Sequence, residues 1–324
     1  MLDHALHFAP YLKSVIWGGD RIATYKGIPT DQTAIGESWE ISAVPGHVSV
    51  VDRGPLTGKS LTDLIGEYGA ELVGADIFNR FGTGFPLLIK IIDARADLSV
   101  QVHPDDELAE KRHHCPGKTE MWHIIDTASD AKIYVGLKER ITPDEYERRV
   151  ADNSIMDVIA SYDSAPGDTF FLPAGRIHAI GAGNLLAEIQ ETSDITYRIY
   201  DYDRRDKDGN PRQLHTAEAR DAIDYTVYPN YRSRPTDSML ADCRYFAVRS
   251  FDLAEHTLSL PRDRESFTII MCLDDNVEVE YSTGAPGCEI RFQRIDRGDT
   301  WLLPATVRDI KVTGPGAKIL SIQA

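Results

Sequence analysis

Short runs of β-branched and aromatic residues, separated by Gly, Pro and Asp, dominate the chain. Runs of about four to eight such residues between turn signals are typical of β-strands. They predict strands at residues 39–42, 47–51, 87–92, 98–103, 121–125, 132–135, 169–172 and 185–189. Apolar positions at helical spacing appear at residues 61–81, 142–162 and 216–223, and Pro104 precedes a further helix start. The pattern therefore predicts an all-β dominated fold, sandwich or barrel, with small helical insertions.

One segment of the chain occurs twice. Residues 167–178 (Gly-Asp-Thr-Phe-Phe-Leu-Pro-Ala-Gly-Arg-Ile-His) align without gaps to residues 298–309 (Gly-Asp-Thr-Trp-Leu-Leu-Pro-Ala-Thr-Val-Arg-Asp). A Gly-Asp turn, an apolar strand and a Pro-Ala corner used twice indicate duplication of a jelly-roll unit, with chance similarity as the alternative. The copies differ at their last position, which is His178 in the first and Asp309 in the second. A metal ligand at His178 would therefore have no counterpart in the second copy.

A polar, proline-containing stretch at residues 228–237 separates the two copies. Such composition is typical of a connection between domains, and 324 residues are enough for two of them. We therefore expect a first domain at residues 1–227, with a short helical insertion at about 138–163, and a second β domain at residues 228–324.

The net charge, hydropathy and cysteine content indicate which kinds of partner and which cellular compartment to expect. The formal charge of −16 argues against nucleic acid, because a polyanion needs a basic surface, whereas a small anion needs only a local cluster of cations. No apolar run approaches the roughly 20 residues that cross a bilayer, and the N-terminus does not resemble a signal peptide. Free thiols in a reducing cytoplasm are expected, since no CxxC pair occurs among Cys115, Cys243, Cys272 and Cys288.

Candidate chemistry gathers between residues 99 and 120. Ser99, Gln101 and His103 lie two positions apart on one predicted strand, so their side chains point to the same face. Lys118 and Glu120 make a second same-face pair. A third motif is the Pro-Ala-Gly turn that precedes His178. A single histidine could occur in any protein by chance, but these three motifs together would do so much more rarely.

These positions favour a metal site. Two imidazoles, one carboxylate and one amide oxygen suit Zn²⁺ with an open position for water or substrate, although amide ligation is less usual. The predicted ligands are Gln101, His103, Glu120 and His178.

Six segments carry a resemblance to a known family. They are Ile16-Trp-Gly-Gly, Gly36-Glu-Ser-Trp-Glu-Ile-Ser, Gln101-Val-His-Pro-Asp, Gly117-Lys-Thr-Glu-Met-Trp, Pro173-Ala-Gly-Arg-Ile-His-Ala and Glu188-Ile-Gln-Glu-Thr-Ser-Asp-Ile-Thr-Tyr-Arg. From about residue 10 to residue 205 the chain resembles type I mannose-6-phosphate isomerases of the compact bacterial form, which belong to the cupin superfamily. The C-terminal third is similar in kind and not by motif.

The resemblance implies two cupin-type jelly-roll β-barrels, of which the first is catalytic and holds one Zn²⁺ on the four predicted ligands. It implies interconversion of mannose 6-phosphate and fructose 6-phosphate through an enediol. Arg198 takes the family's catalytic arginine position, and the positions that line its substrate pocket are Lys90, Ser99, Lys118 and Glu188. Glu188, Lys118 or a zinc-bound water could each serve as the general base.

Other readings compete with this one. An Fe(II) oxygenase would use a facial triad of two histidines and one carboxylate, which Gln101 as a fourth ligand and Lys118 beside the metal disfavour. A non-catalytic, metal-containing sugar-phosphate-binding cupin and an isomerase of another hexose phosphate also remain open. Nothing in the sequence indicates the oligomeric state.

Overall fold

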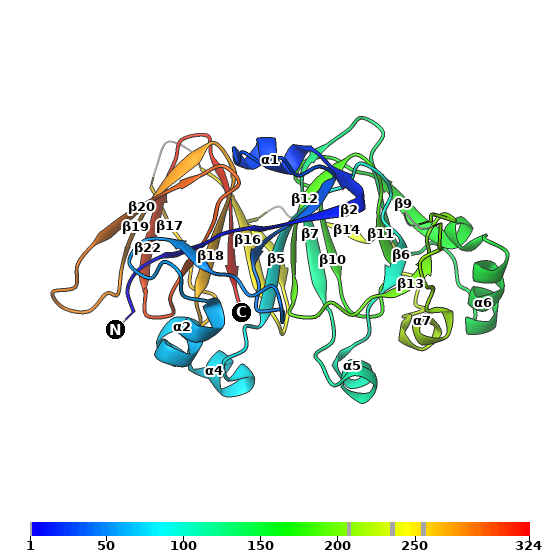
Figure 1. Cartoon of the computed structure of the whole chain (residues 1–324), viewed down its shortest axis with the longest axis horizontal. Helices are drawn as coiled ribbons and strands as arrows, with labels where there is room; N and C mark the ends of the chain where they lie inside the picture. Colours follow the sequence, from blue (N-terminus) through cyan, green and yellow to red (C-terminus); the bar gives the residue numbers. More distant parts are fainter. Residues whose placement is uncertain (1, 206–208, 234–236, 254–256) are drawn as a thin grey trace.

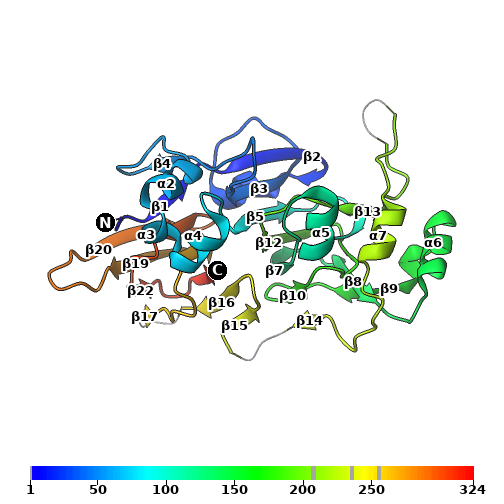
Figure 2. The same cartoon turned by 90° about the horizontal axis from the view of Figure 1, so that it is seen from below.

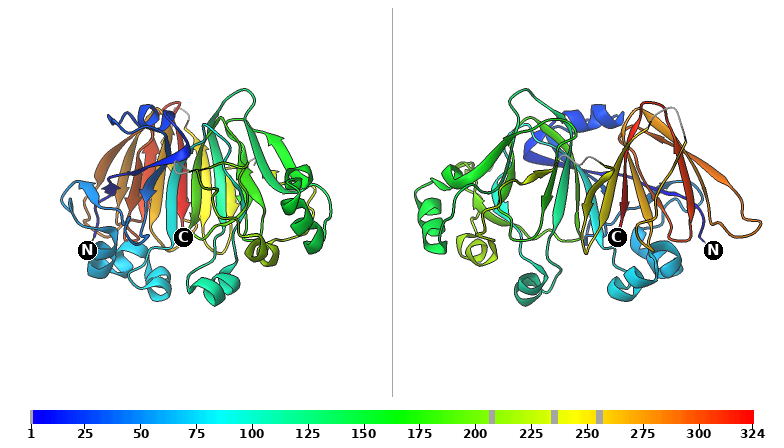
Figure 3. Two further views of the ribbon diagram at one scale, coloured as in Figure 1. Left: turned by 45° about the vertical axis from the view of Figure 1, so that its right-hand side comes forward. Right: turned by 180° about the vertical axis from the view of Figure 1, so that it is seen from behind.

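The structure is a computed structural model that describes residues 2–205, 209–233, 237–253 and 257–324. Its strands form four antiparallel sheets with four, seven, seven and five strands. The sheets follow one another along the long axis of the molecule, from the C-terminal half to the N-terminal half (Figure 1 and Figure 3). The prediction of a mostly β fold is confirmed.

Two sheets that face each other make up the N-terminal half. The seven-stranded one has the order β14 (Arg232–Ser233), β10 (Thr169–Leu172), β7 (Glu120–Thr127), β12 (Asn184–Glu191), β5 (Leu87–Asp93), β3 (Ile35–Ile41) and β2 (Tyr11–Gly19). The five-stranded one has the order β13 (Tyr197–Tyr200), β6 (Val100–Val102), β11 (His178–Ile180), β8 (Lys132–Leu137) and β9 (Ile159–Asp163). Apolar side chains from both sheets meet between them, among them Trp122 and Phe170 from the larger sheet and Ile133 and Ile180 from the smaller.

The C-terminal half repeats this arrangement. Its seven-stranded sheet has the order β15 (Met239–Asp242), β16 (Ala247–Asp252), β23 (Lys318–Gln323), β18 (Thr268–Asp274), β21 (Thr300–Leu303), β1 (Leu6–Phe8) and β4 (Val51–Arg53). Its four-stranded sheet has the order β17 (Leu258–Ser259), β22 (Asp309–Thr313), β19 (Asn276–Ser282) and β20 (Arg291–Asp296). Two strands from the first 53 residues thus lie in the C-terminal sheet, and the domain boundary near residue 228 stays a prediction.

The two seven-stranded sheets pack against each other at the centre of the molecule. Along β12, Leu185, Ala187 and Ile189 belong to the core between these sheets. The alternate residues Glu188 and Gln190 point into the N-terminal half, because successive side chains on a strand face opposite ways. One buried strand therefore carries an apolar face for packing and a polar face for chemistry.

Short helices lie outside the sheets, and in the view from below several of them lie in front of the strand ends (Figure 2). They are α1 (Arg21–Lys26), α2 (Leu61–Tyr68), α3 (Ala70–Val73), α4 (Ala75–Phe81), α5 (Asp106–His113), α6 (Pro143–Ala151), a 3₁₀ helix (Ile155–Val158) and α7 (Thr216–Ala222). Each of the two helix starts predicted after Pro104 and at Thr142 has a side-chain cap. Asp105 accepts a hydrogen bond from the Leu108 backbone N–H at 2.9 Å, and Thr142 accepts one from Glu145 at 3.1 Å.

Three predicted elements differ from the structure. The helix at 61–81 is broken into three because Gly69 and Gly74 adopt positive φ, which the α-helix does not permit. The helical pattern at 142–162 ends early, and its last residues form β9. The predicted strand at 47–51 is wrong except at Val51, where β4 begins. Before that point the Ser49 backbone N–H donates to the Ser42 carbonyl and the Ser49 carbonyl accepts from the Leu61 N–H, so residues 47–49 form no strand ladder.

The sequence repeat occupies equivalent places in the two halves. β10 and β21 each lie in a seven-stranded sheet, and β11 and β22, which follow them, each lie in the smaller sheet of the same half. This correspondence supports duplication. Over the described ranges every sheet keeps two edge strands, so hydrogen bonding closes no barrel. Among the described helices, none is long and apolar enough to span a membrane.

Candidate functional site

The predicted site residues project from both sheets of the N-terminal half into the space between them. On the five-stranded sheet, Arg198 lies opposite Gln101, and Gln101 lies opposite His178. Residues directly opposite on antiparallel strands share one face. On the seven-stranded sheet, Glu188 lies opposite Lys90 on one side and opposite Trp122 on the other.

His103, Glu120 and His178 form a buried group whose potential ligand atoms all lie within 4.8 Å of one another. The Nε2 atom of His178 is 3.3 Å from Glu120 Oε1, and Nε2 of His103 is 3.5 Å from Glu120 Oε2. Glu120 begins β7, His103 directly follows β6, and His178 begins β11. Facing sheets therefore deliver the carboxylate and the imidazoles to one point.

Backbone carbonyls set the orientation of both imidazole rings. The Nδ1 atom of His103 lies 2.8 Å from the Ile195 carbonyl, and Nδ1 of His178 lies 2.7 Å from the Arg176 carbonyl. Since Nδ1 donates, each Nε2 keeps its lone pair and points toward Glu120, as in metal-binding histidines. Burial lowers the pKa of His178 to about 4 and that of His103 well below its usual value, so both rings are neutral at pH 7.

The Glu120 carboxylate is fully buried, and its Oε1 has no hydrogen-bond partner within the described part of the chain. Burial raises the pKa of Glu120 to about 7, against the opposing effect of Lys118, whose Nζ lies 2.9 Å from Oε2. A buried polar atom without a partner is costly unless an ion satisfies it. Two neutral imidazoles and this carboxylate are donors that fit Zn²⁺.

Two further predicted residues reach the same point. The amide nitrogen of Gln101 is 3.2 Å from His178 Nε2, so a turn of the amide would present its carbonyl oxygen there. Lys118 Nζ is 3.2 Å from His103 Nε2. The structure thus brings all four predicted ligands and Lys118 together.

A buried ion pair lies on the seven-stranded sheet beside this group. Lys90 Nζ is 2.8 Å from Glu188 Oε1, and Trp122 Nε1 donates a hydrogen bond of 2.9 Å to Glu188 Oε2. Burial alone would raise the pKa of Glu188, but Lys90 and Lys118 outweigh it and hold that pKa below its usual value. Burial likewise would lower the pKa of Lys90, but Glu188 and Glu37 raise it. Both partners are therefore charged at neutral pH.

Arg198 and Ser99 complete the predicted set. Arg198 is half-buried on β13; its Nη1 donates a hydrogen bond of 3.0 Å to the Gln213 carbonyl, and its Nε has no partner within the described ranges. Ser99 is buried directly before β6. Both are placed to contact a ligand between the sheets.

Two residues on the same face of the seven-stranded sheet, Glu37 and Trp122, were not among the candidates from the sequence. Glu37 on β3 lies 3.7 Å from Lys90 Nζ and accepts a hydrogen bond from Trp39 at 2.7 Å. Trp122 fixes Glu188. The alternation of Glu37 and Trp39 on one strand was an available signal, but nothing local showed that this strand lies beside Lys90.

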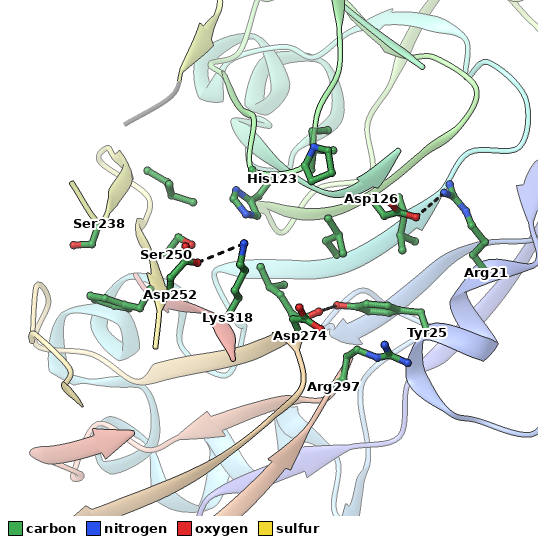
Figure 4. Close-up of a pocket in the computed structure, with 18 of the residues that line it drawn as sticks. Arg21, Tyr25, His123, Asp126, Ser238, Ser250, Asp252, Asp274, Arg297 and Lys318 are labelled. Carbon is green, nitrogen blue, oxygen red and sulfur yellow. Dashed lines mark hydrogen bonds and ion pairs between the residues drawn. The ribbon is translucent and has the colours of Figure 1, made fainter. Parts of the chain in front are cut away.

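A large groove of about 1360 Å³ lies elsewhere, between the two halves (Figure 4). Its lining includes His123 from β7 and Lys318 from β23, with Lys318 3.8 Å from Asp252. The predicted site residues are not part of this lining. Convergent donor atoms, and not cavity size, therefore mark the candidate site.

The second repeat copy offers no comparable group in the described part of the chain. Asp309, the counterpart of His178, is exposed at the start of β22. We expect Asp309→Ala to leave the bound metal per chain unchanged, as measured by elemental analysis of purified protein. Loss of metal from a folded Asp309→Ala protein would show that the second half takes part in binding.

Comparison with known proteins points to one family. The family model for the phosphomannose isomerase type I catalytic domain matches residues 6–130. The mannose-6-phosphate isomerase ManA of Bacillus subtilis is 34% identical over 333 residues, covering 99% of each chain. The mannose-6-phosphate isomerase of Streptococcus mutans is 39% identical over 64% of each chain.

Solved structures agree with the sequence comparison. The crystal structure of the mannose 6-phosphate isomerase from Bacillus subtilis superposes with a TM-score of 0.84 at 31% identity, covering 98% of this chain and 99% of the other. Full-length similarity at this level accompanies the buried histidine and glutamate group described above. The chain belongs to the family of type I phosphomannose isomerases.

Proposed function

We propose that this protein is a zinc-dependent isomerase that interconverts mannose 6-phosphate and fructose 6-phosphate through an enediol. The observation that carries the proposal is the buried group of His103, Glu120 and His178 with Lys118 beside it. Gln101 would be the fourth ligand of a single zinc per chain. The names of the full-length relatives support the choice of sugar phosphate.

Bound zinc would act as a Lewis acid that polarises a sugar oxygen. The reaction also needs a general base that accepts the proton from C2 and a group that moves a proton between the sugar oxygens O1 and O2. We assign the first task to Glu188 and the second to Lys118, the ionisable groups beside the ligand set. Glu188 is ionised, but it is a weak base while Lys90 holds it. A sugar hydroxyl that binds Lys90 and weakens its ion pair with Glu188 would raise the basicity of Glu188.

Arg198 is assigned to the negative charge of the substrate or of the reacting oxygens. Its guanidinium is permanently charged and its Nε is unused within the described ranges, so a donor is available. Lys90 and Ser99 would contact sugar hydroxyls from the two facing sheets. The site is therefore polar on both walls, which a phosphorylated sugar requires.

The paired sheets of each half support a double cupin-type jelly roll. The catalytic domain at residues 1–227 and the metal-free domain at 228–324 are part of the proposal, with β1 and β4 of the first segment added to the C-terminal sheet. All four cysteines are free, which supports the proposed location in a reducing cytoplasm.

The proposal is tested by turnover of mannose 6-phosphate before and after chelation, with zinc added back to the treated protein. We expect activity to vanish with the chelator and to return with zinc. A magnesium add-back serves as the control, because Mg²⁺ prefers oxygen ligands. Stoichiometric zinc without turnover would exclude this substrate and direct the assay to other hexose phosphates. Turnover that survives complete metal removal would overturn the zinc dependence.

A further inference from the structure

The turn at residues 173–177 delivers His178 to the site, and neighbouring segments hold it from two sides. The backbone N–H of Gly175 donates to the carbonyl of His103 at 2.9 Å, so the turn is bonded to another proposed ligand. The carbonyl of Gly175 accepts from the N–H of Asp224 at 2.8 Å. Asp224 begins the segment 224–231, which leads toward the C-terminal half.

Arg176 lies in this turn and is 8% exposed. Its guanidinium lies over the rings of Tyr228 and Tyr231, 4.1 Å and 4.8 Å from their centroids. Its Nε and Nη1 have no hydrogen-bond partner within the described part of the chain, and Asp224 is 3.9 Å from Nη2. Contact with two aromatic faces, together with the more distant carboxylate of Asp224, therefore holds this buried cation.

The two tyrosines are themselves held in place. The Tyr231 hydroxyl donates to the Leu137 carbonyl at 2.9 Å and accepts from the Tyr228 backbone N–H at 3.0 Å. The Tyr231 ring packs on Gly136, where a Cβ would lie 2.2 Å from the ring. The Tyr228 hydroxyl donates to Asp224 at 3.1 Å. Hydrogen bonds and packing thus hold the aromatic pair in the position where it contacts the guanidinium.

The consequence for the site runs through one backbone atom. The carbonyl of Arg176 accepts the Nδ1 proton of His178 at 2.7 Å, and this hydrogen bond sets where Nε2 of the ring points. We propose that segment 224–231, through the contact of Tyr228 and Tyr231 with Arg176, fixes this carbonyl and so positions the His178 ring for the metal. Arg176 is a positioning residue, and this role rests on the proposed metal site.

A substitution at position 176 cannot remove the hydrogen bond, because the acceptor belongs to the backbone. It removes only the restraint on where that acceptor lies. The expected effect is therefore a looser ligand in a folded protein, and it is read out on the metal and not on the fold.

The test compares unmodified protein with Arg176→Ala and Arg176→Lys by the rate at which zinc passes to a chromogenic chelator. Loss of groups that orient a metal-binding histidine typically weakens metal binding roughly 10-fold to 100-fold. Because the backbone acceptor remains in Arg176→Ala, we expect zinc release to accelerate toward the lower end of that range, roughly 10-fold, with partial rescue in Arg176→Lys, which keeps a cation over the rings. The visible spectrum of the Co²⁺-substituted protein should shift in Arg176→Ala, because ligand geometry changes.

Arg232→Ala is the matched control. Arg232 also has its guanidinium over a tyrosine, Tyr162 at 5.5 Å, and it bonds to Asp168 and to the Asp163 carbonyl. Within the described part of the chain its side chain makes no hydrogen bond or ion pair with the turn at 173–177. Its removal should leave zinc release and the Co²⁺ spectrum unchanged. Should Arg176→Ala fail to fold, Tyr228→Leu removes one face of the contact at a position that is 40% exposed, and it should accelerate release in the same direction.

Folded Arg176→Ala or Tyr228→Leu protein that releases zinc at the unmodified rate, with an unchanged Co²⁺ spectrum, would overturn the positioning role. Failure of the proposed reaction is separable from this result. Unmodified protein that binds zinc without isomerising the sugar would overturn the reaction alone, since the comparison reads metal release only.

Discussion

Replacing Glu120 with glutamine is expected to lower mannose 6-phosphate turnover about 1000-fold and to leave the purified protein nearly free of zinc. The two imidazoles are neutral, so this carboxylate is the only anionic donor that the proposed ligand set offers a divalent cation. A Lewis-acidic metal contributes several kcal/mol to the transition state, and about 4 kcal/mol corresponds to about 1000-fold in rate. Steady-state kinetics and elemental analysis on the same preparation measure both effects.

Glu191→Gln is the control for this prediction. Glu191 is also a buried glutamate, but it accepts the Thr119 backbone N–H at 2.8 Å, a bond that a glutamine oxygen can keep. Its zinc content and turnover should stay close to those of the unmodified protein. A Glu120→Gln protein with full zinc and full activity would remove Glu120 from the ligand set.

Glu188→Gln is expected to lower the free energy of unfolding by about 3 kcal/mol, because it leaves the Lys90 ammonium buried without its close carboxylate. Lys90 would keep only Glu37, at 3.7 Å. Both side chains of the broken pair are at least nine-tenths buried, so solvent screens the lost interaction little. Urea unfolding followed by circular dichroism measures the change.

A double-mutant cycle with Lys90→Met isolates the pair. Replacing both charges leaves no unpaired buried ion, so the double variant should be more stable than the Glu188→Gln single variant. If the two single losses simply add, the ion pair is not coupled, and the charged network on this wall does not stabilise the fold. Activity is not informative in these variants, since both residues belong to the proposed site.

Local pattern sufficed for most of the strands that it predicted, which lie in the N-terminal half, and for part of the site. Same-face placement of Ser99, Gln101 and His103 needs only the two-residue period of a strand, and the repeat located His178 after its turn. β5, β7, β10 and β12 appear where apolar runs predicted them. Caps at Asp105 and Thr142 likewise begin helices through contacts that span three residues.

Long-range contacts decided the rest. Whether β6 faces β7 across the interior, so that His103 meets Glu120, depends on which sheets pack together, and no local period encodes this. The same holds for the ion pair of Glu37 with Lys90 and for the placement of β1 and β4 in the C-terminal sheet.

The sequence by itself thus determined which side chains share a strand face, because the backbone of one strand imposes that alternation. Only the tertiary structure decided which faces meet and how the ligands are held. The stacking of Arg176 on Tyr228 and Tyr231 joins residues more than 50 positions apart. Such contacts form only when distant segments are buried together, and the hydrophobic burial that drives this is non-directional. The sequence around Arg176 therefore does not predict its contact with Tyr228 and Tyr231, and the sequence around the tyrosines does not predict it either.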